Sequence, residues 1–252
     1  MKNRLFNLFR ANAKRGSFKA DGNTIYLYDV IVASEADAEW LGGGSLEAFS
    51  KQLASMTGPV ELRINSPGGD VFAGIAMAQV IREYKGDITA HVDGYAASAA
   101  SIVAIAAGKT IMAPASMMMI HKAWTIALGN ADDLLRTAEV LEKIDSQLAK
   151  SYADRAGTEP AMFAALMAEE TWFDAEEAVE IGLADEVASD ESEVVEARSK
   201  WDLSAFEKAP APPREDVAAK NAAAATEAEK KIQAEIEHRQ RMLAVRLLQT
   251  AA

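Results

Sequence analysis

The sequence contains no cysteine and only three histidines among its 252 residues. Without cysteine there is no disulfide framework, no thiolate nucleophile and no cysteine-ligated zinc site. Three scattered histidines do not favour an imidazole-based metal centre either. We therefore expect a protein that works without a metal or an organic cofactor.

Long apolar runs are also missing. The closest, Gly94–Gly108, is 15 residues long, whereas a membrane-spanning helix needs about 18 or more. The basic residues 1–19 have no continuous apolar stretch and no Ala-x-Ala cleavage pattern, so they do not match a secretory signal. These absences predict a cytoplasmic protein without a membrane partner.

The net charge of −12 is unevenly distributed along the chain. Residues 1–20 carry six basic groups and no acidic group, and residues 201–252 carry eight of each sign. Residues 21–200 therefore hold a charge of about −18, which argues against nucleic-acid binding. The basic leader, residues 1–20, is either a frayed, solvated segment or a contact to an acidic surface, such as that of a neighbour in an oligomer.

Strand-like and helix-like segments alternate along the first half of the chain, with glycine turns between them. This alternation predicts an α/β protein of stacked parallel βαβ units, because parallel strands need a crossover between them. The expected strands are 24–33, 60–64, 88–92, 110–113 and 117–120, and the expected helices are 45–56, 71–84 and 96–107, with a turn at Gly94-Tyr95.

A long helix is predicted over Asp132–Asp154, where the apolar positions form one narrow stripe that suits contact with a partner helix. Two shorter helices follow near 159–167 and 175–181. The domain organisation that we expect is a leader (1–20), a main domain (21–190), an acidic and Pro-rich linker (191–216) and an Ala-rich amphipathic helical tail (217–252). The tail is either a partner-binding or coiled-coil element or a marginal helix.

Three short motifs could carry chemistry. Asn65-Ser66-Pro67-Gly68-Gly69-Asp70 follows a strand and opens a helix, so its backbone N–H groups could face an anion or an oxyanion. It lacks the lysine and hydroxyl residue of a phosphate-binding loop, and it could equally be a turn that needs positive φ.

The second motif, Gly94–Ser101, places Ser98 among small residues at another strand-to-helix turn. A nucleophilic serine needs such access, and the next amide, that of Ala99, could donate to an oxyanion. Tight helix packing explains the small residues as well. In the third motif, His121 ends the apolar strand 117–120, where it is either a general base or a structural histidine.

The order and spacing of these motifs, followed by the long helix and by the segment Trp172–Asp185, resembles the ClpP family of serine peptidases. The resemblance extends from about Thr24 to Val187. It implies the ClpP/crotonase-like fold of spiral ββα repeats with a long handle helix. It also implies polypeptide substrates and homo-oligomers of stacked rings around a proteolytic chamber, while an unfoldase ATPase partner is compatible with the sequence but not required by it.

Motif by motif, the resemblance makes Ser98 the nucleophile and His121 the general base, and it makes Gly68 or Gly69, together with Ala99, the oxyanion-hole donors. The family has an Asp two residues before the Phe that precedes the Ala-Glu-Glu-Ala-Val helix, and this chain has Thr171 there. The Thr171 hydroxyl could orient His121 but brings no charge. Glu170 and Asp174 rank after Thr171 as alternative orienters.

In having Thr171, a basic leader and a helical tail, the chain is also similar to the head-maturation (prohead) proteases of tailed bacteriophages. That narrower resemblance implies scaffold and capsid proteins as substrates during virion maturation in an assembling prohead. Three other interpretations remain: a crotonase-type acyl-CoA enzyme, a serine–lysine peptidase using Lys109 or Lys122, and a catalytically silent scaffold with the same fold.

Overall fold

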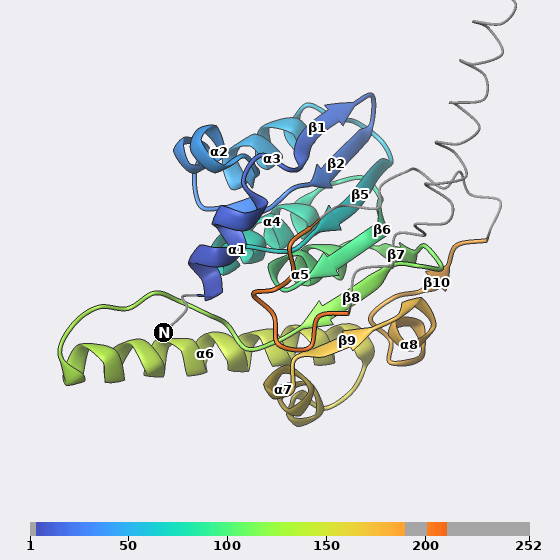
Figure 1. Cartoon of the computed structure of the whole chain (residues 1–252). Coiled ribbons are helices and arrows are strands. Elements are labelled where there is room, and N and C mark those ends of the chain that lie inside the picture. Colours follow the sequence, from blue (N-terminus) through green and yellow to red (C-terminus); the bar gives the residue numbers. More distant parts are fainter. Residues whose placement is uncertain (1–3, 190–200, 211–252) are drawn as a thin grey trace, which may run out of the picture. The chain divides into compact units, whose positions relative to one another are not determined.

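A computed structural model describes residues 4–189 and 201–210 (Figure 1). The chain divides into two compact units, Met1–Ala209 and Pro210–Ala252. Only Pro210 of the second unit is among the described residues, so the fold below is that of the first unit.

The first unit is a mixed α/β fold built on an eight-stranded sheet in the order β1-β2-β5-β6-β7-β10, with β8 paired to β6 and β9 paired to β8. The pairs β2–β5, β5–β6, β6–β7, β6–β8 and β7–β10 are parallel, and β1–β2 and β8–β9 are antiparallel. The strands are β1 (Ser17–Asp21), β2 (Thr24–Tyr28), β5 (Val60–Ser66), β6 (Ile88–Ala97), β7 (Lys109–Met112), β8 (Met117–Ile120), β9 (Thr171–Phe173) and β10 (Glu186–Val187), beside a small pair of β3 (Ile31–Val32) and β4 (Gly44–Ser45). The parallel βαβ prediction is confirmed.

Helices follow most of the strands, as the sequence pattern predicts. Several have side-chain caps at their N-termini: Ser45 accepts from the Ala48 N–H, and Asp70 accepts from the Ala73 N–H. The helices are α1 (Arg4–Asn12), α2 (Glu35–Leu41), α3 (Leu46–Ala54), α4 (Val71–Glu83), α5 (Ala99–Ala104), α6 (Ala131–Ala156), α7 (Pro160–Ala168) and α8 (Ala175–Glu180).

Strand β6 is longer than predicted; one of its edges pairs with β5, and the other edge is shared by two partners. Residues 89–92 pair with β7, while residues 95–97 pair with β8. The predicted turn at Gly94-Tyr95 is therefore wrong, since the chain runs on as a strand to Ala97, and α5 starts at Ala99 instead of at Ala96. This change of partner brings the end of β6 beside the end of β8, which positions the functional site.

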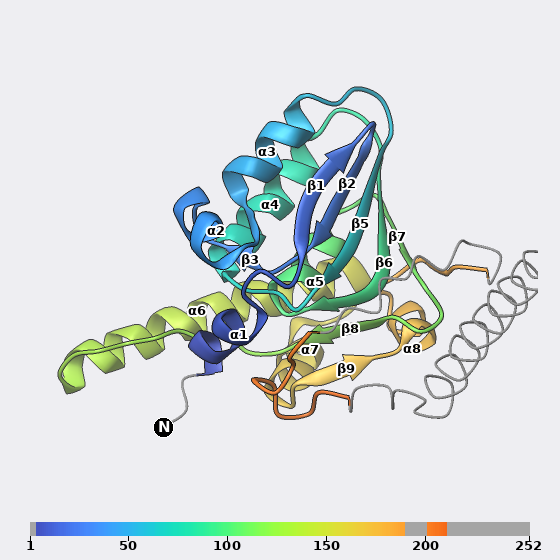
Figure 2. The same cartoon turned by 45° about the horizontal axis from the view of Figure 1, so that its top comes forward.

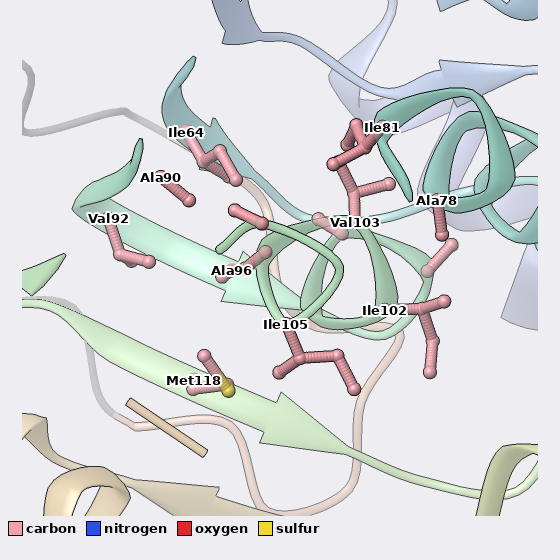
Figure 3. Close-up of a cluster of buried hydrophobic side chains, with 14 of the residues drawn as sticks. Ile64, Ala78, Ile81, Ala90, Val92, Ala96, Ile102, Val103, Ile105 and Met118 are labelled. Carbon is pink, nitrogen blue, oxygen red and sulfur yellow. The ribbon is translucent and has the colours of Figure 1, made fainter. Parts of the chain in front are cut away.

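The hydrophobic core lies between the sheet and helices α4 and α5. Figure 3 shows Val103 of α5, and Ile105 directly after this helix, among side chains from the strands and from α4. Every residue of α5 is buried. Its small side chains therefore allow the helix to pack closely against α4 and β6.

The predicted long helix is present as α6, the handle of the resemblance. Its C-terminal half packs on the core through residues such as Leu148 and Tyr152. Its N-terminal half projects past the sheet, with the preceding segment 122–130 running alongside it in both views (Figures 1 and 2). An Asn130 capping box begins the helix and Gly157, with φ of 65°, ends it.

Two predictions about the chain ends need correction. Residues 4–20 of the leader are not frayed, because residues 4–12 form helix α1 with Leu8 and Asn12 buried. Residues 201–209 of the predicted linker pack on the first unit, with Leu203 and Phe206 buried. The rest of the predicted linker (191–200 and 211–216) and the predicted tail (217–252) lie outside the described residues. Among residues 4–189 and 201–210, no helix is long and apolar enough to cross a membrane, and no cluster of candidate ligands could hold a metal ion.

Candidate active site

Ser98 lies on a sharp turn between β6 and α5. Its backbone has φ of 54° and ψ of −124°, a conformation that costs a non-glycine residue free energy. The Ser98 N–H donates to the Met119 carbonyl of β8 at 2.9 Å. The Ser101 hydroxyl donates to the Ser98 carbonyl at 2.6 Å and also meets the buried Tyr152 hydroxyl of α6 at 2.7 Å. These contacts hold the serine in its strained conformation.

His121 follows β8 directly, and its Nε2 lies 2.7 Å from the Ser98 Oγ. The sequence predicted that the two residues would meet, and the pairing of β6 with β8 explains how residues 23 apart do so. When Nδ1 carries the ring proton, Nε2 accepts a hydrogen bond from the serine hydroxyl. The pair can therefore transfer a proton from the hydroxyl to the imidazole.

The surroundings of His121 are apolar and aromatic. His121 is 8% exposed, and its ring makes edge contacts with Trp124 at 4.4 Å and with Phe206 at 5.5 Å between centroids. Burial, reinforced by the positive charge of Arg4, lowers the pKa of His121 from the usual 6.5 to about 4. The imidazole is therefore neutral at pH 7, as a general base must be.

Gly69 has an N–H that is not used in its pairing with Ile31. Ile31 pairs with Gly69 as a parallel bridge, in which the Ile31 N–H donates to the Gly68 carbonyl and the Asp70 N–H donates to the Ile31 carbonyl. These bonds use the groups flanking Gly69, so the N–H of Gly69 itself is directed away from Ile31. Gly69 also lines the cavity that holds Ser98. A side chain here is impossible without rearrangement, because a Cβ would lie 2.0 Å from the Ile31 oxygen.

Gly68 and Ala99, the other two predicted donors, are also near Ser98. A Cβ on Gly68 would lie 2.8 Å from the Ser98 Cβ and 3.0 Å from the Ala99 nitrogen, so the two turns are in close contact. The Gly68 N–H already donates to the Ser66 hydroxyl at 3.2 Å. Ala99 begins α5 and lines the cavity. The geometry therefore favours Gly69 over Gly68 as the partner of Ala99.

The predicted orienter, Thr171, lies on β9 opposite Ile120 of β8. Its hydroxyl donates to the Leu166 carbonyl at 2.7 Å. Over the described part of the chain, the structure gives no hydrogen bond between Thr171 and His121. The hydroxyl oxygen keeps its acceptor capacity, because its one proton is used on Leu166.

The two alternative orienters are engaged elsewhere. Glu170 is only 7% exposed, and its carboxylate accepts the N–H groups of Glu207 at 2.9 Å and Lys208 at 2.6 Å. Asp174 begins α8, where its carboxylate accepts the Glu177 N–H at 2.8 Å in a capping box. In this arrangement neither carboxylate has a hydrogen bond to His121.

The lysines of the serine–lysine alternative do not bond to Ser98. The Lys109 ammonium donates to the Glu186 carboxylate at 2.6 Å, across the β7–β10 pair. Lys122 is adjacent to His121 in sequence, but the hydrogen-bond partner of the Ser98 hydroxyl is the His121 imidazole. The observed pair is therefore serine and histidine.

The sequence did not predict what closes the site. Leu5 and Leu8 of α1 line the cavity at Ser98, whose volume is about 20 Å³, enough for about one water molecule. Phe206 lies against His121. The only sequence signals were the aromatic residues Trp201 and Phe206 within a polar, Pro-rich stretch.

The fold and this arrangement together define a class: an α/β protein with the serine–histidine pair that serine hydrolases use. A family model described as Clp protease matches residues 49–191, more than half of the chain. The chain is 31% identical over 169 residues to the ATP-dependent Clp protease proteolytic subunit 2 of Treponema denticola, covering 66% of this chain and 84% of that protein. The chain belongs to the Clp protease family.

Two further comparisons agree. An ATP-dependent Clp protease proteolytic subunit of Bacteroides fragilis is 35% identical over 130 residues, which are 51% of this chain and 63% of that subunit. The chain thus matches somewhat less than two thirds of that relative's length. A ClpP1 point mutant from Listeria monocytogenes has a similar fold, with a TM-score of 0.57 at 21% identity over 69% of this chain and 95% of that one.

Proposed function

We propose that this protein is a serine endopeptidase that cleaves polypeptides through an acyl-enzyme on Ser98. The observation that carries the proposal is the 2.7 Å contact between the Ser98 hydroxyl and the Nε2 of a neutral, buried His121. Family membership supports the same activity, since the relatives above are named proteolytic subunits.

In the proposed reaction His121 takes the hydroxyl proton as Ser98 attacks the carbonyl carbon of a peptide bond. The protonated imidazole then gives that proton to the leaving amine, and the acyl-enzyme remains. His121 then deprotonates a water molecule, whose oxygen attacks the ester carbonyl. The protonated imidazole returns the proton to the Ser98 oxygen as the carboxylic acid product leaves. His121 takes part in every proton transfer.

The N–H groups of Gly69 and Ala99 would hold the oxyanion of the tetrahedral intermediate. Gly68 then supports the loop through its bond to Ser66. Loss of one oxyanion donor typically slows such a reaction by about 10²- to 10³-fold.

Thr171 is the residue that we propose for the position of the family's aspartate. Its hydroxyl donates to Leu166, so it can act on His121 only by accepting the Nδ1–H. It would hold the tautomer without a negative charge to stabilise the imidazolium.

We propose extended polypeptides as substrates, lying against the strands that flank the Gly68-Gly69 and His121 segments, with main-chain hydrogen bonds supplying affinity. The names of the relatives include the term ATP-dependent, which supports an ATPase partner that delivers such chains. The narrower role, processing of scaffold and capsid proteins in a phage prohead, rests on the sequence resemblance and on the composition of the chain ends.

We also propose that the handle helix α6 mediates assembly into stacked rings. Its projecting half and the segment before it carry exposed apolar side chains, and Leu128 is 93% exposed. Such a surface suits contact with another copy. Sedimentation at micromolar concentration should give an oligomer, and a fully active monomer would contradict the assembly.

A fluorophosphonate reagent tests the proposed activity directly. Intact mass after long incubation should show one adduct per chain in the wild type and in the matched control Ser55→Ala, whose exposed hydroxyl lies on the C-cap of α3. Ser98→Ala should give no adduct. His121→Gln should react at least about 10³-fold more slowly.

This experiment, together with an acyl-CoA hydrolysis assay of the same variants, separates the alternatives. A serine–lysine enzyme would keep its rate after His121→Gln and lose it after Lys109→Ala or Lys122→Ala. A silent scaffold would give no adduct in any variant. A crotonase-type enzyme would hydrolyse an acyl-CoA thioester equally well after Ser98→Ala.

A further inference from the structure

Next to Ser98, three strands present an apolar and aromatic surface. Ala97, Met119 and Trp172 lie in one row across β6, β8 and β9, because Ala97 pairs with Met119 and Met119 pairs with Trp172. Tyr95 packs edge-on against Trp172 with centroids 6.1 Å apart. In the described structure this row is covered by residues 201–209.

The covering segment, residues 201–208, is held in part by one aromatic side chain. Phe206 contacts three rings at once: Trp124 at 5.1 Å, His121 at 5.5 Å and Trp172 at 5.8 Å between centroids. A side chain buried among aromatic rings contributes much of the free energy of such a contact. The base of the proposed reaction is therefore part of the surface that holds this segment.

Glu170 holds the backbone of the same segment. Its buried carboxylate accepts the N–H groups of Glu207 and Lys208, while the Trp172 indole N–H lies 3.4 Å from one carboxylate oxygen. Charge-assisted bonds of this kind to consecutive amides recognise a main chain whatever its side chains. Glu170 has φ of 48°, a strained backbone conformation for a glutamate.

Helix α1 lies next to Ser98 and is hydrogen-bonded to the covering segment. Asn12, which is fully buried, donates to the Asp202 carbonyl at 2.9 Å and accepts the Asp202 N–H at 2.7 Å. At the other end Arg4 pairs with Glu207 and lies over the Trp124 ring at 5.7 Å. The two segments are thus bonded to each other, and α1 contributes Leu5 and Leu8 to the lining of the cavity at Ser98.

We propose that the surface of Tyr95, Trp124, Glu170 and Trp172 is a peptide-binding site beside Ser98, and that the chain's own residues 201–208 occupy it as an internal competitor of substrate. The proposal rests on the proposed function, since a competitor matters only if Ser98 acts on peptides. The site takes an aromatic side chain in the position of Phe206, followed by two amides that bond to Glu170. Leu5 and Leu8 of α1 line the cavity beside Ser98, which holds about one water, and α1 is bonded to residues 201–208 through Asn12 and Arg4. Departure of residues 201–208 therefore removes contacts that hold α1 over the serine.

The test compares two variants of the full chain. Phe206→Ala removes the aromatic anchor, and Ser204→Ala, an exposed residue of the same segment, is the matched control. The first measurement is hydrogen exchange of the amides in residues 205–209. The second is the rate constant for fluorophosphonate labelling of Ser98.

In the wild type and in Ser204→Ala we expect protected amides at Glu207 and Lys208 and slow labelling. In Phe206→Ala we expect both exchange and labelling to rise by about tenfold or more, because the fraction of open molecules rises. A synthetic peptide with the sequence of residues 201–209 should slow the labelling of Phe206→Ala, and the same peptide with alanine in place of Phe206 should not.

The outcomes separate this inference from the proposed function. If Phe206→Ala leaves exchange and labelling at wild-type rates, the internal competitor is refuted while the serine hydrolase stands. If the amides of 205–209 become unprotected only in Phe206→Ala but Ser98 is never labelled, the peptide site stands and the proposed function fails. Equal inhibition by both synthetic peptides would refute the aromatic preference of the site.

Discussion

Acidification should destabilise the folded protein through His121. In the folded chain, burial and then the charge of Arg4 lower the pKa of this imidazole to about 4, whereas the unfolded chain has a pKa near 6.5. Between these two values the unfolded state binds the proton and the folded state does not. The stability contributed by the neutral imidazole is therefore present above pH 6.5 and is lost as the pH falls toward 4.

The size of the effect follows from the two pKa values. At about 1.4 kcal/mol per pH unit, the interval from 6.5 to about 4 corresponds to about 3 kcal/mol. Asp29 opposes it in almost the same range, because burial raises the pKa of its carboxyl from 3.8 to about 6. The folded state then gains a proton on Asp29 as the pH falls, which is stabilising. The stability of the wild type alone would thus hide both contributions.

A comparison with His121→Gln isolates the histidine. We expect the free energy of unfolding of the wild type, measured by urea denaturation relative to that of His121→Gln, to fall by up to about 3 kcal/mol between pH 7 and pH 4. The NMR signal of the His121 ring should titrate with a midpoint near pH 4. A midpoint of 6 or above, or a constant difference between the two proteins, would refute the account of the buried imidazole.

Three further predictions concern single side chains. Gly69→Ala should lower peptidase activity by about 10²-fold or more, since its Cβ would collide with the Ile31 oxygen; Gly22→Ala, at a positive φ with open space, should keep wild-type activity in the same assay. Tyr152→Phe should lower the free energy of unfolding by about 1 kcal/mol, and an unchanged denaturation midpoint would contradict the role of its bond to Ser101. Thr171→Val should lower kcat by less than about 10²-fold, because the threonine brings no charge; a loss near the ~10⁴-fold typical of a triad aspartate would show that this view of Thr171 is wrong.

Local sequence patterns were sufficient for the elements that carry the site. The alternation in Val60–Ile64, the glycine turn after it and the helical spacing from Val71 predicted β5, the Gly68-Gly69 turn and α4. The same holds for Met117–Ile120 before His121 and for the stripe of α6. Each depends on contacts that are short in sequence or on a periodic apolar face.

Features that depend on distant contacts were not predictable in this way. Gly94-Tyr95 has the composition of a turn, yet β6 continues through it because β8 provides a new partner. Residues 201–208 match a linker in composition, and their structure depends on Glu170 and on Asn12, which is 190 residues away from Asp202. No local pattern encodes such pairings.

The most direct test of the central claim is cleavage of an unfolded polypeptide by the Phe206→Ala chain, compared with the same chain carrying Ser98→Ala or His121→Gln in addition. The account predicts cleavage products from Phe206→Ala, none from the Ser98→Ala double variant and at least about 10³-fold slower cleavage after His121→Gln. Undiminished cleavage by the Ser98→Ala double variant would contradict it.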